Sequence, residues 1–243
     1  MTMKYFWRFS ASAFCAAGLV ILMSCGEEKT AETELSEGIK SAGETDTFRG
    51  EKFHPLRAYT IIYELNGLKS GTVTEHARNY GNEQAQITDT TMTVSGITIR
   101  ENKRVIIRGR DITTIDFDKK NVTVMTNPLF DSIATRLKGK DAAELGRELM
   151  IAMGHEPTSV TETVAGENCE VWKNAQLGQE ICITSDALTL RSSVSMMGMN
   201  FSQTAKEVRR GDPGPDEAYT VPEGFTQTQT PDLGQILGKT KAQ

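Results

Sequence analysis

The sequence predicts an α+β domain in which strands come first, two helices follow, and further strands complete the fold. Three observations predict it. Short runs of alternating apolar and polar residues, separated by polar turns, fill residues 57–124. The apolar period changes to that of a helix over residues 127–153, and strand-like runs return from residue 159 onwards. This order indicates an antiparallel sheet with a helical insertion.

The first strands are marked by alternation and by turn signals. Tyr59, Ile61 and Tyr63 alternate with their neighbours before the Asn-Gly turn at residues 66–67. A later apolar run breaks at residues 101–103, and a polar turn at residues 118–121 precedes the next strand. We therefore expect an antiparallel meander with strands at residues 59–63, 97–100, 105–107, 112–117 and 122–124.

Two helices are expected between the strands. Asn127 is a candidate cap and Pro128 suits the first turn of the first helix, which Gly139 ends. Asp141 and Glu144 resemble a capping box for the second helix. The apolar positions recur at helical spacing and are Phe130, Ile133, Ala134 and Leu137, then Leu145, Leu149, Ala152 and Met153.

Strand signals return after the second helix ends at residues 154–157. They cover residues 159–164, 169–173, 180–184, 188–197 and 201–208. A rigid Pro- and Gly-containing loop follows at residues 211–216, and residues 221–225 close the domain. The polar tail from Thr226 is expected to be loose.

The N-terminus has the organisation of a signal peptide. Lys4 and Arg8 precede an apolar stretch that ends at Met23, which is shorter than the roughly 20 residues that a membrane-spanning helix needs. Residues 22–25, Leu-Met-Ser-Cys, resemble a bacterial lipobox. The resemblance implies cleavage after Ser24 and acylation of Cys25, since two or more chains anchor a protein stably. The alternative is an ordinary secretory signal with a chance cysteine.

The residues after Cys25 predict a tether and then one domain. Residues 26–50 are rich in small and charged residues, so they cannot bury enough surface to fold. Gly26 follows the cysteine where an aspartate would favour inner-membrane retention, so we expect the outer membrane, facing the periplasm. The predicted parts are a signal peptide (1–24), an acylated tether (25–50), the domain (51–225) and a polar tail (226–243).

Charge and cysteine content restrict the partners. The chain has 27 basic and 32 acidic residues, and loss of Lys4 and Arg8 leaves the mature form at about −7. This excess argues against nucleic acid and anionic lipid surfaces as main partners. Cys169 and Cys182 are an even pair in an exported chain and predict a disulfide across a hairpin. The alternative, half of a zinc site, lacks a Cys-x-x-Cys motif.

The order of elements resembles the half-barrel superfamily of Lol-type lipoprotein carriers and related periplasmic lipid-binding lipoproteins. The resemblance rests on residues 59–63, the turn at 118–121, the stretch Gly-Glu-Asn-Cys-Glu-Val-Trp at 166–172 with Cys182, and Val-Pro-Glu-Gly-Phe at 221–225. It implies a curved antiparallel sheet, a half-barrel, whose concave face is covered by the helical insertion. An apolar cavity between them would suit acyl chains. Its expected lining residues are Phe130, Ile133, Leu137, Leu145 and Leu149.

Other constellations favour ordinary structural roles. The three histidines are scattered, the methionines at 196–199 suit a core better than a copper site, and residues 212–217 lack the spacing of a calcium loop. No Gly-x-Ser-x-Gly motif is present, and we expect neither a cofactor nor a metal. The basic stretch at residues 100–110 is expected to be a solvated strand face, with an interaction patch as the alternative.

The sequence therefore predicts a non-enzymatic, membrane-anchored lipoprotein that binds a hydrophobic ligand or a lipidated client. The alternative is an envelope adaptor that binds other proteins through sheet edges or the basic strand face.

Overall fold

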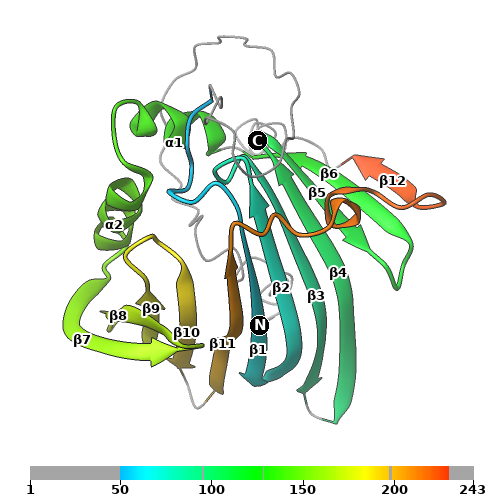
Figure 1. The fold of residues 1–243 in the computed structure, drawn as a ribbon. Helices are drawn as coiled ribbons and strands as arrows, with labels where there is room; N and C mark the ends of the chain where they lie inside the picture. The colour runs from blue at the N-terminus through cyan, green and yellow to red at the C-terminus, as the bar shows by residue number, and fades with distance from the viewer. Residues whose placement is uncertain (1–49, 95, 128, 197–198, 230–243) are drawn as a thin grey trace, which may run out of the picture. The chain divides into compact units, whose positions relative to one another are not determined.

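The fold consists of one large sheet, two α-helices and a short 3₁₀ helix. The computed structural model describes residues 50–229 except residues 95, 128, 197 and 198 (Figure 1). Cys25, the tether and residues 230–243 therefore lie outside the described residues. The strands are β1 (Tyr59–Gly67), β2 (Lys69–Arg78), β3 (Glu83–Val94), β4 (Ile97–Arg108), β5 (Asp111–Asp116), β6 (Asn121–Thr126), β7 (Glu156–Val164), β8 (Glu167–Asn174), β9 (Gln179–Ile183), β10 (Thr189–Met196), β11 (Met199–Arg210) and β12 (Thr226–Gln229). The helices are α1 (Phe130–Leu137), α2 (Ala142–Ala152) and the short 3₁₀ helix η2 (Asp216–Tyr219).

All twelve strands form one open, curled sheet of the half-barrel kind, which confirms the predicted α+β class. Their order is β12-β6-β5-β4-β3-β2-β1-β11-β10-β9-β8-β7. Neighbouring strands are antiparallel except β12, which pairs parallel to β6. The curl is strongest at one end, because β7 contacts β11 although three strands lie between them in the sheet. We call β7–β11 the curled end, and β2–β6 with β12 the wing.

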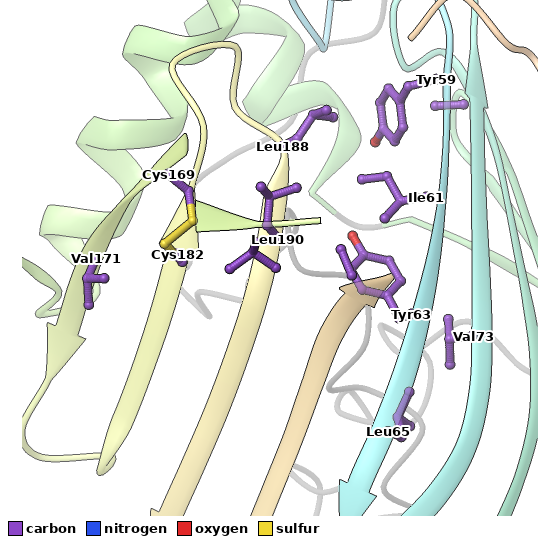
Figure 2. Close-up of a cluster of buried hydrophobic side chains, with 13 residues drawn as sticks. Tyr59, Ile61, Tyr63, Leu65, Val73, Cys169, Val171, Cys182, Leu188 and Leu190 are labelled. Atoms are coloured by element: carbon purple, nitrogen blue, oxygen red, sulfur yellow. A yellow bond between two sulfur atoms is a disulfide. The ribbon is translucent and has the colours of Figure 1, made fainter. Parts of the chain in front are cut away.

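The inner face of the sheet carries the main apolar core. Alternate residues of β1, from Tyr59 to Leu65, are at most 5% exposed and point towards the curled end (Figure 2). They cluster with side chains of β2 and β8–β10, including Val73, Leu190 and Val171. The Tyr63 hydroxyl donates a hydrogen bond to the Thr189 carbonyl at 2.9 Å. The curl therefore buries apolar side chains from strands that are distant in the sheet.

Strands β8 and β9 are buried on both faces. Trp172 and Ile181 are directly paired and contact Met150 of α2, whereas the neighbouring pair, Val171 and Cys182, joins the main core. The predicted disulfide between Cys169 and Cys182 is present. It is diagonal, since Val171 lies opposite Cys182. The two cysteines are therefore two residues away from direct pairing in the hairpin.

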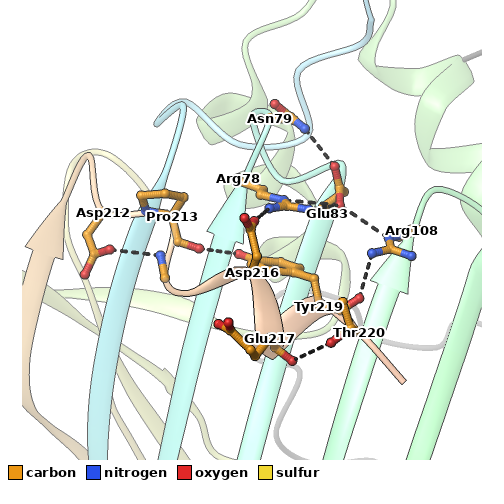
Figure 3. Close-up of polar contacts among 11 residues, drawn as sticks. Arg78, Asn79, Glu83, Arg108, Asp212, Pro213, Asp216, Glu217, Tyr219 and Thr220 are labelled. Carbon is orange, nitrogen blue, oxygen red and sulfur yellow. Dashed lines mark hydrogen bonds and ion pairs between the residues drawn. The ribbon is translucent and has the colours of Figure 1, made fainter. Parts of the chain in front are cut away.

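The outer face of the wing is covered by the C-terminal segment. Residues 212–225, which we call the strap, cross strands β2–β4 (Figure 3). Tyr219 is 1% exposed and packs with Ala85, and the Arg78 guanidinium lies 4.0 Å from the centre of its ring. Arg108 donates a hydrogen bond to the Tyr219 carbonyl, and the Arg104 guanidinium binds two further strap carbonyls. The strap therefore supplies the wing with a second small core.

Several predicted boundaries need correction. Strand β4 is continuous through residues 101–103, because Glu101 pairs there with Lys69 and Lys103 instead of ending the strand. Helix α1 is capped by Leu129 and not by Asn127, whose side chain accepts a hydrogen bond from the Leu129 amide. Asp141 caps α2 as predicted. The tail expected to be loose begins with β12, which is held by backbone pairing with β6.

Candidate functional site

The inner face of the wing is the candidate site, because it is the part of the sheet's inner surface that the main core does not fill. Directly paired residues of antiparallel strands point to the same face, so the inner face can be followed from β1 across the wing. Ile61 is paired with Glu75, Glu75 with Gln86, and Gln86 with Val105. A parallel row begins at Tyr59 and runs through Ala77, Gln84, Ile107, Ile112 and Met125.

A strip of apolar side chains lies at the outer end of these rows. Val105 and Ile107 of β4, Ile112 of β5 and Met125 of β6 are all half-buried. They differ in this respect from the fully buried aliphatic side chains of β1. A concave face with partly exposed aliphatic side chains can receive an apolar ligand, since further burial is favourable.

Helix α1 is fixed at the border of this strip. The Phe130 ring lies close to Gly109 in the β4–β5 turn, 3.6 Å from where a Cβ atom would stand. Arg110 of the same turn forms an ion pair of 2.8 Å with Asp131 of α1. Phe130 also stacks on Phe53, with 5.0 Å between the ring centres. Aromatic rings therefore adjoin the end of the strip that Ile107 and Ile112 form.

A buried acidic group lies between the strip and the main core. The Tyr59 hydroxyl donates a hydrogen bond of 2.7 Å to the Glu75 carboxyl. Burial raises the pKa of Glu75, and the bond from Tyr59 offsets this only in part. Burial also raises the pKa of the Tyr59 hydroxyl. The His54 ring lies against Tyr59, and burial lowers the pKa of its imidazole. This corner of the inner face therefore favours uncharged forms.

Charged groups occupy the other end of the wing's inner face. Glu101 accepts hydrogen bonds from the ammonium groups of Lys69 and Lys103. Burial alone would raise the pKa of Glu101, but these two bonds outweigh it and the pKa is lowered. The hydroxyl oxygen of Thr90, paired with Glu101 in register, is buried and has no hydrogen-bond partner within the described part of the chain. The inner face of the wing thus carries an apolar strip and, further along β4, an ionic cluster.

The histidines and the potential metal ligands are dispersed over the described residues. The described residues contain no group of three or more His, Cys, Asp or Glu side chains that could hold a metal ion. The histidines lie apart: His54 stacks on Tyr59, His76 bonds to Thr60, and His155 bonds to Gln179. An apolar strip beside polar groups matches an amphiphilic molecule.

The five predicted lining residues divide into two groups. Leu137 and Leu145 are buried, at 4% and 2% exposure. Phe130, Ile133 and Leu149 are half-buried. Phe130 adjoins the strip, while α2 packs through Met150 on β8 and β9. That these residues line a cavity stays a prediction.

The basic stretch on β4 is largely occupied by contacts within the chain. Arg100 pairs with Asp89, Lys103 with Glu101, and Arg108 with Glu83. Arg104 binds strap carbonyls, and Arg110 binds Asp131. These basic side chains therefore link β4 and the turn after it to β3, to the strap and to α1.

Sequence reasoning missed Glu75 and Met125 as members of this face. The signal for Glu75 was present, since Val73, Glu75 and Ala77 alternate with polar residues in β2. A charged residue among the apolar positions of a strand is unusual, because an unpaired carboxylate is costly to bury. Met125 could not be placed, because its face depends on the register of β5 and β6.

Comparisons with known proteins concern the fold. The chain matches no protein-family model and no curated protein. Similar solved structures include an uncharacterized conserved protein from Thermus thermophilus, with a TM-score of 0.48, 7% identity and coverage of 71% of this chain and 90% of that one. The MucA/MucB complex of Pseudomonas aeruginosa has a TM-score of 0.40 and 13% identity, with coverage of 74% of this chain and 62% of that one. The lipoprotein LppX of Mycobacterium tuberculosis has a TM-score of 0.29 and 12% identity, with coverage of 62% of this chain and 85% of that one. Within the described residues, no helix is long and apolar enough to cross a membrane.

Proposed function

We propose that this protein is a lipid-anchored, non-enzymatic protein of the cell envelope that binds a hydrophobic or amphiphilic ligand, a lipid or a lipidated client, on the inner face of its half-barrel. The observation that carries the proposal is the half-buried apolar strip of Val105, Ile107, Ile112 and Met125 on the wing. An acyl chain laid along the strip would be removed from water at about 0.8 kcal/mol per buried methylene.

The polar groups beside the strip support an amphiphile in particular. Glu75, held by Tyr59, offers a hydrogen-bonding carboxyl group whose pKa is raised by burial, and the Lys69–Glu101–Lys103 cluster offers charge. A headgroup could reach either end while its chain lies on the strip. The lipobox around Cys25 supports a location beside the membrane that would supply such a ligand.

Photocrosslinking tests the ligand. The full-length chain, expressed with its own leader, is incubated with a phospholipid that carries a photoactivatable acyl chain. Ile107→Glu places a charge on the strip and should reduce labelling at least five-fold. Val160→Glu, at a 49% exposed position of β7, is the control and should label like the wild type. Equal labelling of both variants would contradict the proposal.

The anchor is tested separately. Cys25→Ser removes the thiol that the lipobox marks for acylation, so the protein should leave the membrane fraction and retain its uncleaved leader. Metabolic labelling with palmitate should be lost in parallel. Unchanged fractionation would refute lipidation while leaving the ligand proposal intact.

The adaptor function remains the alternative. The basic strand face supports it poorly, since its bases bind within the chain. The open sheet edge at residues 97–101 of β4 supports it better, because no described strand pairs with that edge.

A further inference from the structure

Half of β4 forms a free sheet edge. Strand β5 pairs with β4 only from Lys103 to Arg108, so residues 97–101 have no strand beside them on that side within the described chain (Figure 1). The same residues are fully paired with β3 on their other side. The β3–β4 hairpin therefore extends past β5 and β6 with one edge open. An open edge presents a row of backbone donors and acceptors that another strand can use.

The residues whose backbone groups face outward follow from the strand's alternation. The Phe117 amide donates to the Asn102 carbonyl, so the backbone of Asn102 points to the β5 side. Because backbone direction alternates along a strand, Thr98 and Arg100 point to that side too. Their amides and carbonyls, four groups in all, have no backbone partner among the described residues.

The side chains of this edge are unusual for an unprotected strand. Ile97 and Ile99 lie on the inner face and are 66% and 49% exposed. Natural edges are commonly protected by charges, proline or bulges. Here the inner side of the edge carries the aliphatic Ile97 and Ile99 before it reaches Glu101, and its pairing with β3 shows no bulge. Exposed aliphatic side chains combined with free backbone groups favour an extended strand as the occupant.

The edge is complementary to itself. If two copies align antiparallel about Ile99, Thr98 of each lies opposite Arg100 of the other. These are the two outward-facing residues, so four backbone hydrogen bonds form. Ile99 then meets its counterpart on the symmetry axis, and Ile97 lies opposite Glu101, so no like charges are directly opposed. The paired segment, residues 97–101, has the length of the open edge.

We propose that two copies of this protein associate through the residue 97–101 edges of β4, forming a two-fold symmetric dimer with one continuous sheet. The interface is isologous, as a two-fold dimer requires. Its small size predicts weak association, favoured where the protein is concentrated on a membrane. The inference does not depend on the ligand proposal, because the edge lies beyond the apolar strip.

Disulfide trapping tests the register. In a pair without backbone hydrogen bonds the two Cα atoms lie about 4.5 Å apart, within the range that a disulfide spans. The full-length chain carrying Ile99→Cys, expressed with its own leader, should give a dimer band in non-reducing gels of whole cells. Val221→Cys is the matched control, since Val221 is also 49% exposed and lies on the strap. It should give at most a tenth of that dimer.

A proline variant separates edge pairing from random collision. Thr98→Pro in the Ile99→Cys background removes an outward amide without taking a donor from the β3–β4 ladder. Crosslinking should fall at least five-fold. Thr98→Ala keeps the amide and should preserve crosslinking, and trypsin resistance checks that both variants fold. The proposal is overturned if Ile99→Cys stays monomeric, if it couples to a different protein, or if Thr98→Pro has no effect.

Discussion

The curled end and the wing are parts of one sheet, yet they are stabilised differently. At the curled end, apolar side chains of β8–β10 are buried against β1, and α2 covers the opposite face of β8 and β9. The wing places its small cores on the outer face, under the strap and Phe225, and leaves aliphatic side chains half-buried on the inner face. The difference indicates that the curled end carries most of the inner-face core, while the wing leaves apolar side chains on its inner face only partly covered.

Ion pairs reflect the same division. At the curled end, Arg210 of β11 reaches Glu167 of β8 and Asp186 in the β9–β10 turn, so it links strands that the curl brings together. In the wing, Glu101 and its lysines lie on the inner face. Charges thus close the curled end, whereas in the wing the Glu101 cluster forms part of the candidate binding face.

The largest expected difference comes from the same truncation in both regions. Ile181→Ala removes a side chain that is 8% exposed and packs on Trp172 and Met150, so it should lower the free energy of unfolding by about 3–4 kcal/mol. Ile107→Ala, at a half-buried wing position, should cost about 1–2 kcal/mol. Urea denaturation followed by tryptophan fluorescence measures both. An equal or larger loss for Ile107→Ala would contradict the assignment of stability to the curled end.

Loss of the disulfide should weaken the curled end first. Cys169 and Cys182 are 13 residues apart, and opening a loop of that length costs about 3 kcal/mol. In the Cys169→Ser/Cys182→Ser variant, hydrogen exchange should speed up in β8 and β9 before it changes in β3 and β4. A uniform increase across the sheet would show that the two regions unfold as one unit.

The sequence predicted the elements better than their pairing. It indicated Cys169–Cys182 correctly, yet the register of β8 and β9 is set by the turn at residues 175–178. There Gly178 adopts a φ of +56°, and a Cβ atom would lie only 2.3 Å from the Ser195 carbonyl oxygen. Such a contact between segments has no signature in local sequence, so the diagonal geometry of the disulfide could not be foreseen.

Polar strands were the second limit of sequence reasoning. Strand β12 reads Thr-Gln-Thr-Gln and is set by pairing with β6, after Phe225 packs edge-on against Phe117. Strand β4 continues through Glu101 because nearby lysines neutralise it. The candidate site was subject to the same limit, since the strip containing Met125 exists only once its strands are in register.

The smallest expected effect is a difference in how the stability contributed by Glu75 of the wing and Asp186 of the curled end depends on pH. The pKa of Glu75 is raised by burial, so its protonated form favours folding, and that stability is lost as the pH rises above about 4.5. Burial would also raise the pKa of Asp186, but bonds from Arg210 and Thr184 outweigh it and the pKa is lowered. The stability that Asp186 contributes is therefore present above about pH 3.8 and is lost as the pH falls.

The two groups should consequently show opposite pH profiles. Glu75→Gln, which keeps an acceptor for Tyr59, should gain stability relative to the wild type between about pH 4 and pH 8. Asp186→Asn should lose about 1 kcal/mol or less at about pH 7, as expected for a partly exposed ion pair, and should converge with the wild type near about pH 3. Urea midpoints at each pH measure both differences. Parallel profiles would mean that the pKa of Glu75 is not raised in the folded wing, and the effect of its burial beside the apolar strip would then be wrong.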